Sequence, residues 1–168
     1  MRSSLSLHAT GVAIVLLGSS VGAFAQAGAT AKVCGYLPIA DLEALFGAKV
    51  SALRGNDGTT MSMCAARFPD PNLTANVVGN PPSTVVTLEQ RIAAVKPMLE
   101  TRGSQITSDG KVACFTDYIE MGGKKLPTAS CFRQDGGYLA FTLQADDAKR
   151  ISFDTVRRLL DKAAAQRK

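Results

Sequence analysis

Short runs of alternating apolar and polar residues fill the C-terminal half of the chain, and glycine-containing pairs separate them. This alternation is typical of β-strands that bury one face. The separating pairs are Asp109-Gly110, Gly122-Gly123 and Asp135-Gly136, which supply the positive φ angles of two-residue hairpin turns. The pattern predicts a four-stranded antiparallel meander. Its strands are residues 104–108, 111–120, 125–134 and 138–144.

The Gly122-Gly123 turn predicts which residues face each other on its two strands. In a two-residue hairpin, Met121 and Lys124 form the hydrogen-bonded pair beside the turn, so Cys114 and Cys131 form a non-hydrogen-bonded pair. Cα atoms in such a pair approach to ~4.5 Å, which suits a cross-strand disulfide. We therefore predict a Cys114–Cys131 disulfide, which leaves Cys34 and Cys64 to pair by elimination.

The same counting predicts the two faces of the meander. The other two turns, treated as two-residue loops, place Ile106 opposite Ala113 and Phe132 opposite Leu139. One face is then apolar and requires a covering layer of helices; it carries Phe115, Phe132, Leu139, Phe141 and Leu143. The other is mixed and carries the two cysteines with Thr116, Tyr118, Arg133, Tyr138, Thr142 and Gln144.

Proline and turn residues limit strand pairing elsewhere. Pro127 has no N–H, so pairing with the strand that begins at Tyr138 should end or bulge beside it. In the N-terminal half, residues 48–53, 60–68 and 75–78 are predicted strands, the first two joined around residues 56–58.

Three helices are expected from their end signals and apolar spacing. The first opens at Pro38 and ends at Gly47, with Leu42, Leu45 and Phe46 as its apolar stripe.

Capping residues mark the other two helices. Thr87 and Gln90 have capping-box spacing at the start of the second, in which Pro97 predicts a kink or an early end. Ser152 caps the third. The predicted class is α+β: an antiparallel sheet with about three helices packed on it, in the order α-βββ-α-ββββ-α.

The first 25 residues have the parts of a secretory signal in order: Arg2, an apolar segment at 11–17, and small residues ending at Ala25. We expect cleavage after Ala25 to leave one disulfide-bonded domain, residues 26–168, without a transmembrane span. Cleavage removes the only histidine, His8, and lowers the net charge from +5 to about +4. The expected location is the periplasm or the exterior.

Four cysteines and a mature chain without histidine restrict the chemistry. No two cysteines have the close spacing of a zinc site or a Cys-x-x-Cys redox pair, so structural disulfides are favoured. No imidazole can activate a serine or cysteine nucleophile. Ser108-Asp109-Gly110-Lys111 matches a Ser-x-x-Lys string but lies in a predicted turn. We predict no catalytic residue, no cofactor and no metal.

Carboxylates are the remaining candidates for catalysis. Asp117 and Glu120 point to opposite faces of a predicted strand, and Asp146-Asp147 lies in a loop beside basic residues. A carboxylate-based hydrolase acting in the periplasm is an alternative, because a fold can bring together acids that are distant in sequence.

Basic residues gather on the last predicted helix. Arg157, Arg158 and Lys162 could make a weak contact with an anionic surface, although cations near a helix C-terminus are also favoured by its dipole. The positive charge is mild and spread along the chain, and we expect no nucleic-acid partner.

Near the N-terminus, Cys34-Gly35-Tyr36-Leu37-Pro38 is followed by Leu42, Leu45 and Gly47 and then by Met63-Cys64-Ala65. This segment resembles the opening of a domain of unknown function found in small exported bacterial proteins and lipoproteins. The match covers about a third of the mature chain, and a lipidation cysteine is missing. The resemblance implies an envelope protein with a Cys34–Cys64 disulfide, and it brings no activity or ligand.

The mixed sheet face supplies the candidate binding surface, Tyr118, Arg133 and Tyr138. Exposed aromatic residues beside an arginine suit recognition; the alternative is that the N-terminal half of the chain covers them. We therefore expect an exported, non-enzymatic binding or accessory module of the bacterial cell envelope, with an unknown envelope protein or small ligand as partner. A structural envelope protein is a further alternative.

Overall fold

The computed structural model describes residues 31–80, 87–134 and 138–167. These residues form a seven-stranded antiparallel sheet and three α-helices, in the predicted order α-βββ-α-ββββ-α. The predicted leader with His8 and the Asp135-Gly136 turn lie outside the described residues.

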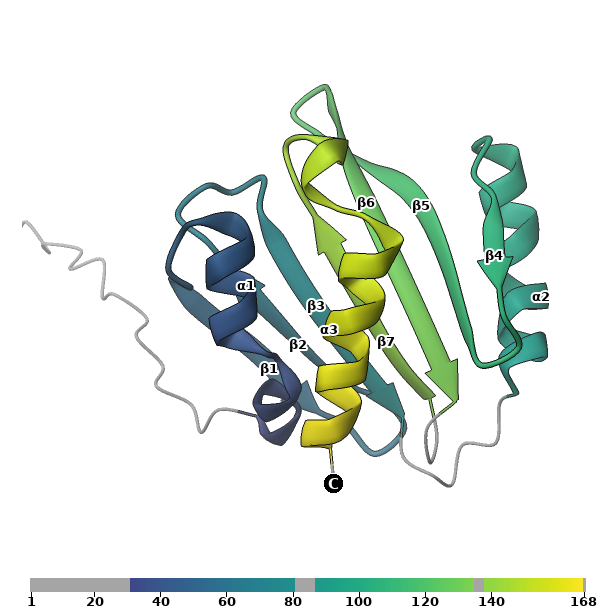
Figure 1. Cartoon of the computed structure of the whole chain (residues 1–168), viewed down its shortest axis with the longest axis horizontal. Coiled ribbons are helices and arrows are strands. Elements are labelled where there is room, and N and C mark those ends of the chain that lie inside the picture. The colour runs from purple at the N-terminus through teal and green to yellow at the C-terminus, as the bar shows by residue number, and fades with distance from the viewer. Residues whose placement is uncertain (1–30, 81–86, 135–137, 168) are drawn as a thin grey trace, which may run out of the picture.

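The strands lie side by side in the order β1-β2-β3-β7-β6-β5-β4 (Figure 1). They are β1 Ala52–Asp57, β2 Ser62–Arg67, β3 Thr74–Asn80, β4 Ile106–Ser108, β5 Val112–Met121, β6 Lys124–Gln134 and β7 Tyr138–Gln144. The helices are α1 Ile39–Phe46, α2 Leu88–Thr101 and α3 Phe153–Gln166, with the short 3-10 helices η1 Lys32–Tyr36 and η2 Ala148–Arg150. None of the described helices is long and apolar enough to cross a membrane.

The predicted end signals place the helices. Gly47 ends α1 in a left-handed conformation with φ 66°. Thr87 and Gln90 form the predicted capping box at the start of α2, and the Ser152 hydroxyl accepts a hydrogen bond in the first turn of α3. These ends are therefore decided by residues close in sequence.

Pro97 lies inside α2, and the helix continues to Thr101, so the predicted early end is wrong. A proline removes one backbone hydrogen bond from a helix. Leu99, two residues further along, is buried and packs the last turn against the protein, which offsets that loss.

The register of β5 and β6 confirms the predicted turn. Gly122 and Gly123 both have positive φ, as a two-residue hairpin turn requires. Cys114 faces Cys131 with their Cα atoms 4.1 Å apart, and they form a disulfide. The second disulfide joins Cys34 to Cys64, so the predicted connectivity is present.

The predicted end of pairing at Pro127 is also observed. The β6–β7 ladder stops at Thr128, and the Pro127 carbonyl oxygen accepts a hydrogen bond from the Ala145 N–H. Pro127 thus lies just beyond the end of the ladder, where its lack of an N–H interrupts no strand pairing.

Two hairpins of the structure differ from their predicted turns. Asp109 donates its N–H to the Val112 carbonyl, so the β4–β5 turn is centred on residues 110–111 and Ile106 faces Phe115 instead of Ala113. A shift of two residues leaves each side chain on its predicted face. In the first hairpin, residues 56–57 belong to β1, and the turn comes after them, where the Gly58 N–H donates to the Met61 carbonyl.

The β6–β7 connection is one residue longer than predicted, which changes the faces. Gln134 faces Tyr138, and Phe132 faces Ala140 instead of Leu139. A shift of one residue turns every side chain of the strand over. Leu139, and with it the rest of the β7 apolar set, therefore shares a face with the cysteines.

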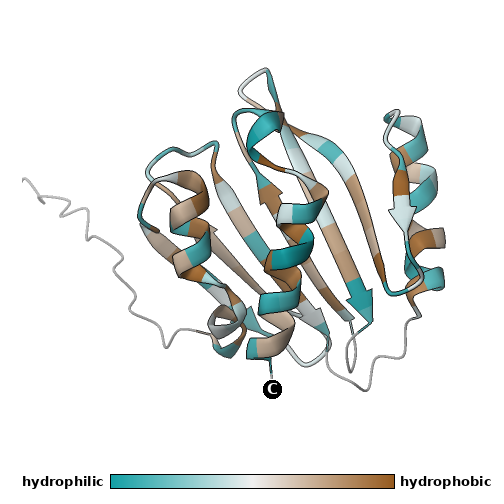
Figure 2. Cartoon of the chain, viewed as in Figure 1, coloured by the Kyte–Doolittle hydropathy of each residue, from teal (hydrophilic) through white to brown (hydrophobic). Residues whose placement is uncertain are grey.

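Helices consequently cover both faces of the sheet, whereas the prediction placed them on one. α1, α3 and η1 cover the face that carries Cys64, Cys114 and Cys131, which we call the cysteine face (Figure 1). Figure 2 shows hydrophobic strand segments behind α3 and hydrophilic segments on its outward side. α2 packs on β4 and β5 from the other side, over a smaller core that includes Phe132 and Leu88.

One row of facing residues on the cysteine face contains three of the four disulfide cysteines. It crosses six strands and consists of Gly55, Cys64, Val77, Phe141, Cys131 and Cys114. Gly55 is at its end because a Cβ there would lie 2.5 Å from Cys34 Sγ and 2.8 Å from Ala31 Cβ. The first disulfide thus occupies the space that any larger residue would need.

We expect Gly55→Ala to lower the free energy of unfolding by about 1–3 kcal/mol, because the added methyl group overpacks the disulfide. The measurement is urea unfolding of the oxidised protein. Gly79→Ala in β3 is the matched control: its Cβ would meet no atom closer than 3.6 Å, so its effect should stay within about 1 kcal/mol. Equal losses in both variants would contradict this account.

Candidate functional site

The predicted binding surface of Tyr118, Arg133 and Tyr138 is not one surface. Tyr118 and Arg133 project from the cysteine face, and Tyr138 projects from the opposite face. The prediction that the three share a face is wrong because the β6–β7 register differs by one residue. Arg133 is also engaged, since its Nη1 donates to Asp161 Oδ1 on α3 at 2.9 Å.

Both tyrosines are half-buried and lie against basic side chains. Lys125 Nζ is 4.2 Å from the centroid of the Tyr118 ring. The Arg91 guanidinium of α2 is 4.5 Å from the centroid of the Tyr138 ring. Each ring therefore makes a cation–π contact within the fold, on opposite sides of the sheet.

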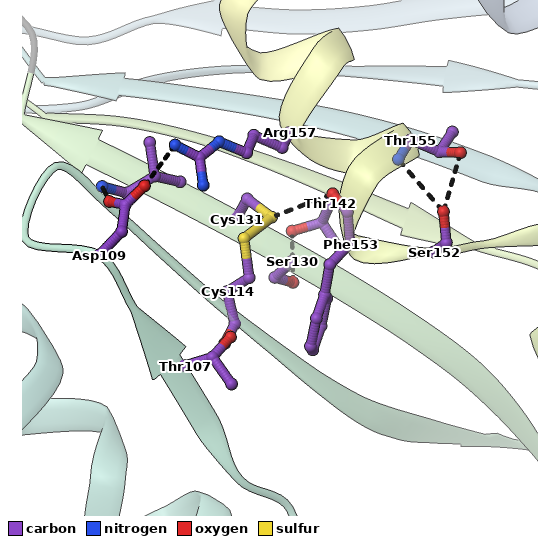
Figure 3. The surroundings of a disulfide bond; sticks show 11 residues. Thr107, Asp109, Cys114, Ser130, Cys131, Thr142, Ser152, Phe153, Thr155 and Arg157 are labelled. Atoms are coloured by element: carbon purple, nitrogen blue, oxygen red, sulfur yellow. Dashed lines mark hydrogen bonds and ion pairs between the residues drawn. A yellow bond between two sulfur atoms is a disulfide. The ribbon is translucent and has the colours of Figure 1, made fainter.

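The Cys114–Cys131 disulfide lies beneath the start of α3 (Figure 3). Cys131 Sγ is 3.9 Å from the Phe153 carbonyl oxygen. Arg157, one turn further along α3, reaches across to Asp109 in the β4–β5 turn. All four cysteines of the chain are disulfide-bonded, so no thiol is available as a nucleophile.

The predicted basic surface of α3 is largely neutralised. Arg157 pairs with Asp109, and Lys162 Nζ is 2.5 Å from Asp41 Oδ1 on α1. Arg158 is exposed and makes no ion pair with any described residue. A hollow of ≈ 460 Å³ on the outer side of α3 is lined by charged side chains of both signs.

Asp109 is held in its charged form. The backbone N–H groups of Val112 and Lys111 and then the Arg157 guanidinium keep the pKa of Asp109 well below its usual range. Its carboxylate thereby closes the β4–β5 turn and connects it to α3.

Other carboxylates in this layer behave in the same way. A hydrogen bond from Lys49 lowers the pKa of Glu43, and one from Arg150 lowers the pKa of Asp146. A general acid at neutral pH requires a raised pKa instead. These side chains are therefore arranged as structural anions.

The carboxylates considered from the sequence do not form a pair. Asp117 and Glu120 project to opposite faces of β5, as predicted, and Asp117 Oδ2 accepts a hydrogen bond of 2.8 Å from Arg102. Asp147 caps η2, while Asp146 pairs with Arg150. Within residues 31–80, 87–134 and 138–167, no three His, Cys, Asp or Glu side chains gather as a metal site would require.

The sheet face opposite the cysteine face carries a second group of polar side chains, which sequence reasoning missed. Arg54, Asn56, Met63, Arg67 and Asn76 form what we call the open face, on β1, β2 and β3. Met63 is 43% exposed, and both arginines are exposed. This face is on the far side of the sheet in Figure 1.

The two arginines of the open face are neighbours. Arg54 faces Ala65 across β1 and β2, and Arg67 lies two residues beyond Ala65, so the arginines occupy diagonal positions. Neither side chain bonds to another described residue, and no carboxylate projects from this face of β1, β2 or β3. Two like charges thus lie together without a counterion from the described part of the chain.

Acidic side chains are concentrated on the other side of the protein. Five of the seven ion pairs among the described residues involve α1, α3 or the connection that leads into α3. Most cations of that layer therefore pair with a carboxylate, whereas Arg54 and Arg67 on the open face pair with none of the described residues. Sequence reasoning missed Arg54 because the predicted strand 48–53 ended before it. In the structure the turn of the first hairpin comes later, so Arg54 belongs to β1.

We expect Asp109→Ala to lower the urea midpoint of unfolding at pH 7. A depressed carboxyl pKa contributes stability that is present above the unfolded value of about 3.9 and is lost as pH falls toward the folded value. The difference between the wild type and the variant should therefore shrink steadily below about pH 4. A difference that stayed constant down to the lowest pH at which both proteins fold would contradict the assignment.

No protein-family model, curated protein or solved structure matches the chain. The resemblance of residues 34–65 to a domain of unknown function therefore stays a prediction.

Proposed function

We propose that the chain is an exported, non-enzymatic binding module of the bacterial cell envelope and that its open face binds an anionic partner. The observation that carries the proposal is the pair Arg54 and Arg67 on neighbouring strands, which has no counterion among the described residues. A guanidinium presents five N–H donors in a planar fork that matches carboxylate or phosphate groups.

The chemistry around the pair supports recognition of a polar partner. Asn56 and Asn76 add amide donors and acceptors on the same face, and Met63 adds an exposed, adaptable apolar contact. The sheet holds these side chains at fixed spacing, because β2 is hydrogen-bonded on both sides. Such a surface can bind a negatively charged partner selectively without any catalytic group.

Two disulfides support the exported location, since such bonds persist in oxidising compartments. The signal-like first 25 residues point the same way. Anionic polymers and acidic protein segments are therefore the proposed classes of partner in the envelope.

Arg54→Glu/Arg67→Glu should weaken binding to poly-L-glutamate and to polygalacturonate by at least about tenfold, because charge-assisted hydrogen bonds contribute about 1.5–3 kcal/mol each. Binding would be measured by calorimetry at low salt and should fall as salt is raised.

Arg158→Glu is the matched control, because Arg158 is likewise exposed and makes no ion pair with a described residue, but lies on α3. It should leave affinity within about twofold, which is ~0.4 kcal/mol. Circular dichroism checks that all variants fold. If the double variant binds as the wild type does, or if Arg158→Glu alone removes binding, the open face is not the binding surface.

A further inference from the structure

We propose that the anionic partner is an extended acidic segment of polypeptide that pairs with β1 as an additional strand of the sheet. The inference rests on the proposed function and names the partner class of the same surface. It follows from the hydrogen-bonding pattern of β1 combined with the charge of the open face.

β1 is an edge strand, and its outward backbone groups bond to no other described residue. It lies at the end of the sheet, so β2 is its only strand neighbour among the described residues, and all six of its residues are exposed. The hydrogen bond from the Gly58 N–H to the Met61 carbonyl lies in the β1–β2 register and sets its phase. Hydrogen-bonded pairs alternate along an antiparallel ladder, so the backbone N–H and C=O groups of Arg54 and Asn56 bond to β2.

The alternate residues of β1 therefore point their backbone groups outward. Leu53, Gly55 and Asp57 each direct an N–H and a C=O away from β2, toward the free edge. These groups form a template for one more strand, as in peptide recognition by β-strand addition. The opposite edge strand, β4, has only three residues and lies beside α2.

The side chains of β1 specify what the added strand should carry. Alternate residues of an added strand project on the two faces of the sheet. Those on the open face would lie beside Arg54 and within reach of Arg67, which favours acidic residues. Those on the cysteine face would lie beside Leu53, which is 39% exposed, and this favours apolar residues. The expected segment alternates acidic and apolar residues.

The same charges disfavour a second copy of the chain as the partner. Antiparallel pairing of two β1 strands would bring Arg54 of both copies to the same face of adjoining strands. The chain also carries a net charge of +5. Like charges repel across such a pairing, whereas an acidic segment compensates them.

The test uses a capped peptide of eight residues that alternates glutamate and valine, with binding followed by fluorescence anisotropy. It should bind the wild type and lose at least about tenfold in affinity for Arg54→Glu/Arg67→Glu. A peptide that alternates lysine and valine should not bind.

Two N-methylated forms of the peptide test backbone pairing directly. One is methylated at every valine N–H and the other at every glutamate N–H, so in only one of them do the methyl groups face β1. That form should lose binding, and the other should stay within about twofold.

Leu53→Pro tests the same contact from the protein side. The Leu53 N–H points to the free edge, where no described residue accepts a hydrogen bond from it, so the variant should fold and lose the peptide. Circular dichroism and the urea midpoint check its folding, and the two methylated peptides keep the test decisive if this variant is unstable.

Each failure is distinguishable. If both methylated peptides bind as well as the parent while the two arginines are still required, strand addition is wrong and the proposed function stands. If neither acidic polymer nor peptide binds, the proposed function itself fails. A dimer of the free protein in sedimentation velocity that Leu53→Pro dissociates would assign the edge to a second copy and overturn the inference.

Discussion

The row of facing residues that contains Cys64, Cys131 and Cys114 is the constraint on which the rest of the structure depends. The two disulfides close loops of 30 and 17 residues and would each contribute ~3 kcal/mol by restricting the unfolded chain. One attaches η1 to β2 over Gly55, and the other joins β5 to β6 beneath α3. This row points toward the helices that cover the cysteine face. Because side chains alternate along a strand, the residue after each member of the row projects from the opposite face.

The distribution of charge follows from that arrangement. Carboxylates in the layer that covers the cysteine face bond to the basic side chains of α3 and its neighbours, as Asp161 does with Arg133 and Asp41 with Lys162. Arg54 is adjacent to Gly55 in β1 and therefore points away from that layer. Ion pairs of α3 and arginines without a counterion among the described residues thus lie on opposite faces of one sheet.

Parts of the structure that depend on close neighbours in sequence could be predicted. The Gly122-Gly123 turn, the Thr87 capping box and the Gly47 helix end each rest on a few adjacent residues, and each is observed. The Cys114–Cys131 disulfide followed from the turn by counting. Tyr138 was misplaced because the connection before it is one residue longer than a two-residue turn. The alternation of β7 separates its apolar face from its polar face but does not tell which side of the sheet each of them joins.

The sequence by itself therefore determined the α+β class, the order of elements, the end of α1, the starts of α2 and α3 and the pairing of the cysteines, because local hydrogen bonds and turn geometry decide these. Only the tertiary structure decided which face of each strand is covered, and hence that Arg54 and Arg67 are neighbours with no counterion from a described residue. The physical reason is that side chains alternate between the two faces of a strand, and this alternation does not say which face the helices cover. The choice between them is made by packing against helices that are distant in sequence.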